Sequence, residues 1–192
     1  MNETAATSLF PPRPTALAQD ILRRLIRPGD WVIDATAGNG HDTLFLAGCV
    51  GPAGRVLAFD IQEAALASTR SRVGEAAWVE FFHESHAKMA THTAAGSVTA
   101  VMFNLGYLPG ETHDLTTEAG ETLAALEIAA QLLKSGGVLS VICYPGHPAG
   151  SAEASAVEEW MTARAAQGWR VARYGAVGTR RAAPFLLLAG KI

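Results

Sequence analysis

Short apolar runs alternate along this chain with longer segments in which apolar residues recur every three or four positions. The short runs have the length and the Val, Ile, Leu and Phe content of strands buried on both faces. We expect strands at 31–34, 55–60, 77–83, 98–104 and 137–143. We expect helices at 41–49, 62–73, 116–134 and 151–166, with a short helix after the third strand. Strands that alternate with helices predict a parallel, doubly wound sheet in an α/β fold.

The last two apolar runs break this alternation. Residues 169–174 and 185–189 both have strand character, and only a short connection containing Gly and Arg separates them. A connection of this length cannot hold a crossover helix. We therefore expect an antiparallel hairpin at the C-terminal end of the sheet.

The N-terminal region divides into an arm and a helix. Residues 1–14 contain three prolines and no periodicity, which predicts a flexible arm. Thr15 is expected to cap a helix that ends at Pro28-Gly29. Its apolar face is predicted to contain Leu17, Ile21, Leu22, Leu25 and Ile26. At 192 residues and 49% hydrophobic content, the chain has the length for a single domain, expected at 15–192.

The stretch after the first strand carries the clearest chemical signal. Asp34 ends the strand, glycines follow at Gly38 and Gly40, and a helical pattern begins at about His41. Glycine can adopt positive φ and let the backbone approach a ligand, while the first turn of a helix offers unpaired N–H groups. This arrangement of strand, Gly-rich turn and helix is typical of a nucleotide-binding, Rossmann-like α/β fold.

The residues around the glycines indicate which nucleotide is bound. Thr43 occupies the place of the third glycine in a dinucleotide fingerprint, which disfavours NAD, and no Gly-Lys-Ser/Thr follows, which excludes a P-loop. Asp34 and Asp42 would repel a pyrophosphate but suit a cationic ligand that has an amino group. S-adenosylmethionine, a sulfonium with an α-ammonium, is such a ligand. Asp60 ends the second strand 20 residues after Gly40, where an acid accepts hydrogen bonds from ribose hydroxyls.

This interpretation assigns a neighbour to each part of the cofactor. Asp60 would contact the ribose and Ile61 the adenine, with Gln62 near the base. The Gly-rich turn would follow the amino-acid moiety, and its flanking carboxylates would face the ammonium. The expected cofactor-binding residues are Asp34, Ala35, Thr36, Gly38, Asn39, Gly40, Asp42, Thr43, Asp60, Ile61, Gln62, Ser85, His86 and Asn104.

Loops at the carboxyl ends of the strands are expected to meet the substrate. Asn104 ends the fourth strand, and its amide can accept a hydrogen bond from an amine and direct the nitrogen lone pair at a methyl donor. Tyr107 can stack on a base, and His147, between two prolines, can relay a proton. We therefore expect Asn104, Tyr107 and His147 to be catalytic, with Ser85 and His86 near the adenine. The alternatives are an Asn-capped turn with a core Tyr, and a surface histidine.

Other residue types narrow the function. His83, His86 and His92 lack the cysteine or paired acid that usually accompanies histidine in a metal site, and methyl transfer from a sulfonium needs no metal, so none is expected. Cys49 and Cys143 form no C-x-x-C pair and are expected to be reduced, small core residues. No apolar run reaches membrane-spanning length and no signal peptide is evident, which predicts a cytoplasmic protein without a membrane partner.

The charge distribution bears on macromolecular partners. The net charge of −3 and the pI of about 6.1 argue against a protein that coats nucleic acid non-specifically. However, residues 160–192 carry six basic and no acidic side chains. This segment allows a local basic face, although a solvated helix and hairpin would account for it equally well.

Several motifs together resemble one family. They are Asp34-Ala35-Thr36-Ala37-Gly38-Asn39-Gly40-His41-Asp42-Thr43, Ala58-Phe59-Asp60-Ile61-Gln62, Ser85-His86, Phe103-Asn104-Leu105-Gly106-Tyr107-Leu108-Pro109-Gly110, Thr116-Thr117, Tyr144-Pro145-Gly146-His147-Pro148 and Pro184-Phe185. From about residue 15 to the C-terminus the chain resembles the YtqB-like (MnmM) family of class I methyltransferases, also described as rRNA methylases. The run from Asn104 to Gly110 is the specific part of the match.

The resemblance implies a single-domain class I methyltransferase that acts on tRNA. Its members use S-adenosylmethionine, releasing S-adenosylhomocysteine, to convert the 5-aminomethyl group of wobble uridine, usually 2-thiolated, to 5-methylaminomethyl. The anticodon loop of tRNA is then the expected partner, and a homodimer is left open. Two departures bear on substrate contacts, since Ser151 replaces a usual Lys and Arg180-Arg181-Ala182-Ala183 replaces an Asn-rich stretch.

Three other classes of function compete with this expectation. An rRNA or small-molecule methyltransferase would keep the cofactor site, although a small substrate would need a lid for which the short loops leave little chain. A non-catalytic RNA-binding module would need only the basic C-terminal segment. An NAD oxidoreductase is disfavoured by Thr43.

Overall fold

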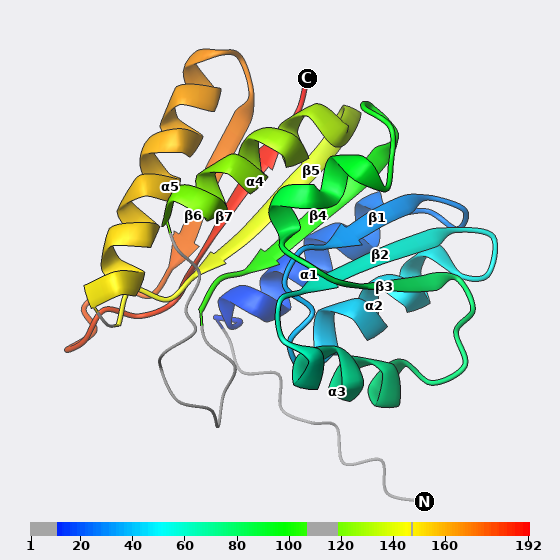
Figure 1. Ribbon diagram of the computed structural model, residues 1–192. Helices are drawn as coiled ribbons and strands as arrows, with labels where there is room; N and C mark the ends of the chain where they lie inside the picture. Colours follow the sequence, from blue (N-terminus) through cyan, green and yellow to red (C-terminus); the bar gives the residue numbers. More distant parts are fainter. Residues whose placement is uncertain (1–10, 107–118, 147) are drawn as a thin grey trace, which may run out of the picture.

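The computed structural model describes residues 11–106, 119–146 and 148–192, and these form one seven-stranded sheet with helices on both faces (Figure 1). The strands are β1 (Trp31–Asp34), β2 (Arg55–Asp60), β3 (Val79–His83), β4 (Val98–Asn104), β5 (Leu133–Cys143), β6 (Arg170–Gly175) and β7 (Phe185–Gly190). The helices are α1 (Pro14–Leu25), α2 (His41–Val50), α3 (Glu63–Val73), the 3₁₀ helix η1 (His86–Thr91), α4 (Ala119–Leu132) and α5 (Pro148–Ala166).

The strands lie in the order β3-β2-β1-β4-β5-β7-β6. The first five are parallel to one another, and β7 is antiparallel to both β5 and β6. The doubly wound sheet and its C-terminal antiparallel hairpin are thus confirmed. The order reverses between β1 and β4, and this switch point is where open α/β sheets bind ligands, beyond the carboxyl ends of their strands.

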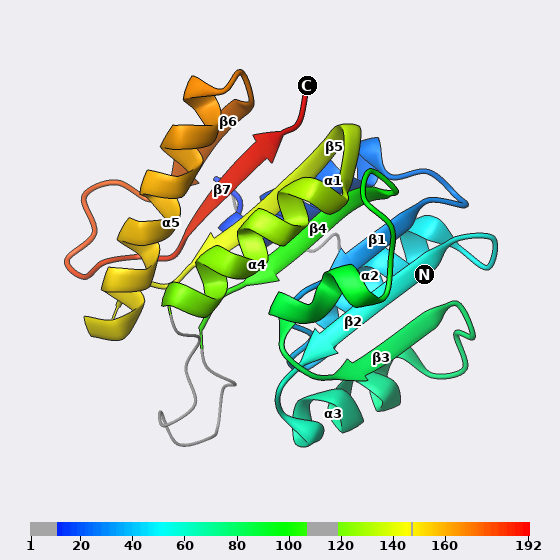
Figure 2. The ribbon, with the colours of Figure 1, turned by 45° about the horizontal axis from the view of Figure 1, so that its top comes forward.

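Two apolar layers cover the sheet, and strand periodicity assigns residues to them. On β2, Leu57 and Phe59 are buried in the layer that includes residues of α4 and α5, whereas Val56 and Ala58 are buried with residues of α1, α2 and α3. Successive side chains of a strand point to opposite faces. Figure 2 shows α4 and α5 in front of the sheet and α1 and α2 behind it.

The central helix and strand junction differs from expectation. The helix predicted at 116–134 extends too far toward the C-terminus, because α4 ends at Leu132 and β5 already begins at Leu133. Leu133 pairs with Val98, and the register then shifts before Ala100 pairs with Val138. The pairing with β4 therefore overrides the helical pattern. Residues 116–118 lie outside the described part of the chain.

Helix α1 also corrects two expectations. The helix begins at Pro14, within the predicted arm, and Arg13 rather than Thr15 occupies the N-cap position. Proline is well suited to the first helical position because the N–H it lacks would be unpaired there. Leu25, predicted on the buried face, is 42% exposed, whereas Leu22 and Ile26 are buried.

The two cysteines are free thiols in the positions expected, one on α2 and one on β5. Cys143 is buried in the core, and Cys49 is only partly buried. Across the described residues, we find no helix with the length and apolar character that crossing a bilayer requires.

Candidate functional site

The Gly-rich turn between β1 and α2 lies at the switch point and is supported from behind by α3. Gly38 and Gly40 have φ of 51° and 79°. A Cβ on Gly40 would lie 2.8 Å from Cα of Thr69. The Thr69 hydroxyl donates a hydrogen bond of 2.9 Å to the carbonyl of Gly38. The turn therefore requires glycine at Gly40 both for its backbone conformation and for the close approach of α3.

Asn39, at the tip of the turn, is also held by α3. The side chain of Arg72 donates a 2.5 Å hydrogen bond to the Asn39 carbonyl, and Ser68 lies 3.4 Å from its amide oxygen. These contacts bind the backbone of the turn to a helix that begins beyond β2. The path of the turn thus depends on two successive β–α units.

Asp34, at the end of β1, is a fully buried carboxylate. It accepts hydrogen bonds from the hydroxyl of Thr43 (2.5 Å) and the backbone N–H of Thr36 (3.2 Å). Burial and the neighbouring negative charge of Asp42 raise the pKa of Asp34 to about 7. A carboxyl in this state will ionise readily when a cation is placed beside it.

A second carboxylate, Asp42 in the first turn of α2, connects α1 to β4. Its Oδ1 accepts a hydrogen bond of 2.8 Å from the side-chain amide of Gln19, and its Oδ2 accepts one of 3.2 Å from Nδ2 of Asn104. Asp42 is 7% exposed. Because an ionised carboxylate only accepts hydrogen bonds, it fixes the amide of Asn104 with the nitrogen inward. The backbone of Asn104 is fixed as well, since its N–H donates a hydrogen bond of 2.7 Å to the hydroxyl of Thr36.

Asp60, at the end of β2, faces the other side of the turn. Its carboxylate accepts from the backbone N–H groups of Gly38 (2.8 Å) and Gln62 (2.9 Å). Ile61 is 48% exposed beside it. Oε1 of Gln62 is buried and has no hydrogen-bond partner among the described residues. An exposed apolar side chain and an unpaired acceptor therefore flank this carboxylate.

Ser85 and His86 lie after β3 and serve first as local supports. The Ser85 hydroxyl caps η1 by accepting from the N–H of Ala87 (3.1 Å), and it also bonds to Glu121. His86 is buried, with Nδ1 3.1 Å from the carbonyl of Ala35, to which it donates. Burial lowers the pKa of His86, so the ring is neutral at pH 7. Contact between either residue and an adenine stays a prediction.

The structure places the expected cofactor residues at or after the carboxyl ends of β1, β2, β3 and β4, and their roles stay predictions. Of the expected catalytic residues only Asn104 can be located. Tyr107 and His147 lie outside the described residues. Among the residues that are described, no three His, Cys, Asp or Glu side chains come together as a metal-binding group.

Sequence reasoning missed two residues of the site, Gln19 and Thr69, and gave Tyr144 no role beyond its place in a family motif. The contacts of Gln19 and Thr69 span more than 20 positions of the chain, so no local pattern marks them. Tyr144 follows β5, and its ring would lie 3.5 Å from a Cβ on Gly106. Burial and the charge of Asp42 raise the pKa of Tyr144. A tyrosine at the end of a strand beside the switch point was the available signal.

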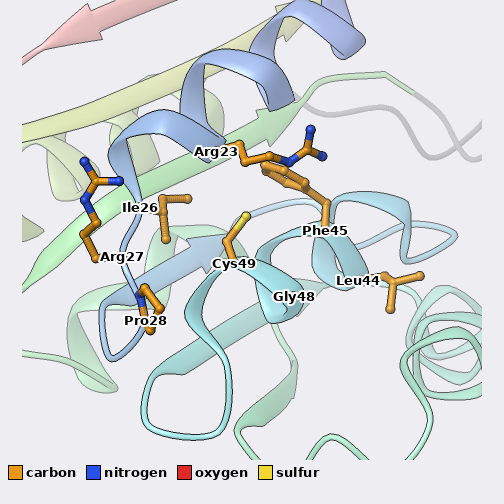
Figure 3. A pocket seen from close by; sticks show the side chains of 8 residues that line it. All are labelled: Arg23, Ile26, Arg27, Pro28, Leu44, Phe45, Gly48 and Cys49. Atoms are coloured by element: carbon orange, nitrogen blue, oxygen red, sulfur yellow. The ribbon is translucent and has the colours of Figure 1, made fainter.

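A separate cavity of about 540 Å³ lies between α1 and α2 (Figure 3). Arg23 covers the ring of Phe45 there at 5.2 Å, and Cys49 lines the wall. Burial raises the pKa of the Cys49 thiol, which therefore stays protonated at neutral pH. None of the expected cofactor residues lines this cavity.

Comparison with known proteins identifies relatives that cover most of the chain. The family model described as "Putative rRNA methylase" matches residues 56–190. A protein of Arabidopsis thaliana named "tRNA (mnm(5)s(2)U34)-methyltransferase, chloroplastic" is 36% identical over 191 residues, covering 93% of this chain and 69% of that protein.

Solved structures agree in fold and length. A protein from Clostridium thermocellum described as a "putative rRNA-methylase" has a TM-score of 0.90 and 35% identity, covering 96% of this chain and all of that one. A Streptococcus mutans protein described as a "putative methyltransferase", solved in complex with S-adenosylhomocysteine, has a TM-score of 0.85 and 31% identity. That match covers 94% of this chain and 98% of that one.

Replacing Gly40 with Ala should destabilise the protein. The αL conformation costs a non-Gly residue about 1–2 kcal/mol, and the new Cβ would meet the backbone of Thr69. Gly48→Ala is the matched control, because a Cβ there meets no atom within 4 Å. Thermal unfolding should show a lower midpoint for Gly40→Ala and an equal or higher one for Gly48→Ala. Equal midpoints for the two variants would contradict the close packing of α3.

The buried carboxyl predicts an unusual pH dependence of stability. Because the pKa of Asp34 is about 7 when folded and the ordinary value is 3.8, its contribution to stability is present below about pH 4 and is lost as pH rises to 7. Asp34→Asn removes this dependence. The unfolding midpoint of the variant, relative to that of wild type, should therefore rise as the pH increases from 5 to 8. Asp20→Asn, at an exposed carboxylate, is the control. Parallel midpoints for Asp34→Asn and wild type would refute the assignment.

Proposed function

The chain belongs to the family described as "Putative rRNA methylase" and is an S-adenosylmethionine-dependent methyltransferase, and from this premise we propose that it methylates the 5-aminomethyl group of wobble uridine in tRNA. The product would be 5-methylaminomethyluridine, with or without a 2-thio group. The observation that carries the proposal is the amide of Asn104, whose nitrogen donates to Asp42 and whose oxygen accepts no hydrogen bond from the described residues. The product named for the Arabidopsis thaliana relative supports the choice of substrate.

The residues at the switch point fit S-adenosylmethionine. The buried acceptor of Gln62, which no described residue pairs, suits the amino group of an adenine, and Ile61 offers an exposed apolar side chain to its ring. Asp60 retains free lone pairs for ribose hydroxyls, since each of its oxygens accepts one hydrogen bond in the structure. Asp34 and Asp42 supply negative charge for the ammonium.

When bound, the cofactor supplies a methyl group already activated on a sulfonium, so the protein mainly has to position the acceptor amine. Asn104 would do this by accepting one N–H of the amine with Oδ1. Its amide cannot rotate without losing the bond to Asp42, and its backbone cannot shift without losing the bond to Thr36. The lone pair of the amine is then directed along one line.

The amine must also be neutral to react. A primary alkylamine has a reference pKa of about 10.4, similar to that of lysine. Asn104 would present a neutral oxygen to the amine, while Asp34 and Asp42 would supply negative charge for the ammonium of the cofactor. Exclusion of water by a bound RNA loop would further favour the uncharged amine. We assign Tyr107 to packing on the uracil, and His147 or water to removal of the proton after transfer.

The proposal is tested by nucleoside mass spectrometry of tRNA from a deletion strain. We expect 5-methylaminomethyl nucleosides to disappear and the 5-aminomethyl precursors to accumulate, and the gene should restore the product. An unchanged tRNA profile together with a missing methyl group in rRNA would contradict the proposal. It would favour the rRNA substrate that the family description suggests.

Replacing Asp60 with Ala should abolish or strongly weaken cofactor binding, because the carboxylate both accepts from Gly38 and faces the proposed ribose position. Isothermal titration calorimetry with S-adenosylhomocysteine measures this loss. Glu75→Ala removes an equal charge from an exposed position just beyond α3 and should bind as wild type does. Binding by Asp60→Ala with wild-type affinity would remove the assignment of the nucleoside position.

Asn104→Ala should lower turnover by roughly 10² or more and leave cofactor affinity nearly unchanged, because the substitution removes positioning of the amine. Single-turnover methylation of a tRNA that carries 5-aminomethyluridine measures the chemical step directly. Calorimetry with S-adenosylhomocysteine on the same variant is the control. Near-wild-type single-turnover methylation would show that Asn104 does not orient the acceptor.

A further inference from the structure

The connection between β6 and β7 lies at the carboxyl ends of the parallel strands, as the candidate site does. Phe185 pairs with Cys143, the last residue of β5, and with Gly175, the last residue of β6. The connection 176–184 therefore extends beyond the carboxyl ends of the parallel strands. A Cβ on Gly146 would lie 3.7 Å from the carbonyl of Ala182, which places this connection beside the loop after β5. Both views show it next to the start of α5 (Figures 1 and 2).

Arginines of two segments lie near the carboxyl end of β6 and the connection that follows it. Arg180 and Arg181 belong to the connection itself and are exposed. Arg13 precedes α1, and the hydroxyl of Tyr174 donates a 2.7 Å hydrogen bond to the carbonyl of its neighbour Pro12. Tyr174 stands immediately before the last residue of β6. We refer to Arg13, Arg180 and Arg181 as the arginine strip.

The side chains of the arginine strip form no ion pair among the described residues, and Arg170 is the one other arginine of the described C-terminal segment without one. Arg164 pairs with Glu127 and Arg173 with Glu158, while the ammonium of Lys191 donates to the carbonyls of Ala130 and Leu133. The nearby segments 11–13, 144–152 and 175–184 contain no Asp or Glu. No carboxylate of these segments therefore weakens the positive potential.

We infer that the arginine strip binds phosphates of the RNA whose target base enters the site at Asn104. The inference rests on the proposed function and identifies the surface that receives the substrate. Asp34, Asp42 and Asp60 lie at the same sheet edge, and the chain has a net charge of −3, so a polyanion needs local cations to approach. Arginine donates two parallel hydrogen bonds to a phosphate, which suits this task.

The position of the strip agrees with such a substrate. Asn104 pairs with Ile142 of β5, and Ile142 pairs with Leu186 of β7. Two strand spacings of about 4.8 Å separate β4 from β7, so the strip is displaced to the side by roughly 10 Å or more. At about 3.4 Å of axial rise per phosphate in one strand of a duplex, this corresponds to roughly three nucleotides. A hairpin loop can therefore place one base at Asn104 and its neighbouring phosphates on the strip.

The test measures binding of a fluorescein-labelled anticodon stem–loop RNA by anisotropy over a range of salt concentrations. Each lost phosphate contact should reduce the slope of log Kd against log salt by about 0.7–0.9. Arg180→Ala/Arg181→Ala should therefore reduce it by roughly 1.4–1.8 and raise the KM for tRNA, while affinity for S-adenosylhomocysteine stays unchanged. Arg24→Ala/Arg170→Ala is the matched control, with the same charge change at exposed arginines toward the opposite ends of α1 and β6. Arg13→Ala should reduce the slope by the amount expected for one phosphate contact, about 0.7–0.9.

Each outcome decides between the two levels of inference. If the double variant and wild type have the same salt slope and the same KM for tRNA, the strip is not the RNA surface, although the proposed function stands. If wild type binds the RNA through the strip but transfers no methyl group to tRNA, the surface stands and the proposed substrate is wrong. If the wild-type protein does not bind the RNA, the inference that the arginine strip binds RNA is wrong. Equal competition by poly-glutamate overturns it as well, because it would indicate an acidic protein partner.

Discussion

Burial of two carboxylates at the switch point is the constraint on which the site depends. Asp34 is 1% exposed and Asp42 is 7% exposed, and an unpaired buried charge is costly. Hydrogen bonds from Thr36, Thr43, Gln19 and Asn104 offset part of that cost. The raised pKa of Asp34 shows that the compensation is incomplete. A site with this residual cost is stabilised by a cationic ligand, so the same feature that destabilises the free protein favours binding.

The hydrogen bonds that satisfy these carboxylates join distant parts of the chain. Gln19 on α1 meets Asp42 on α2, and Asp42 meets Asn104 on β4, across separations of 23 and 62 residues. Thr69 on α3 holds the Gly-rich turn from the other side. The site therefore forms only when both helices α1 and α3 have packed on the sheet. The position of the acceptor amide is consequently set by the whole fold rather than by the loop that contains it.

Sequence reasoning succeeded where chemistry is local and failed where it depends on packing. The strand, turn and helix around Gly38 and Gly40 and the acid at Asp60 follow from spacing along the chain, and the structure brings them together. Contacts of Gln19 and Thr69 have no such spacing, because the fold alone makes them neighbours. The end of α4 was misplaced for the same reason, since pairing of Leu133 with Val98 overrides the helical pattern. Periodicity predicts which elements exist, whereas tertiary pairing decides where they stop.

The placement of charge around the site reconciles a cationic cofactor with a polyanionic substrate. Acidic groups are buried beneath the turn, where they would act at short range on the ammonium of the proposed cofactor position, and the surrounding low dielectric would strengthen that interaction. The exposed arginines lie two strands or more to the side, where water and salt screen the carboxylates over about 8–10 Å. An RNA backbone can therefore be attracted by the strip with little repulsion from Asp34 or Asp42. On the proposed function, this separation of opposite charges would let a protein of negative net charge hold RNA beside its buried carboxylates.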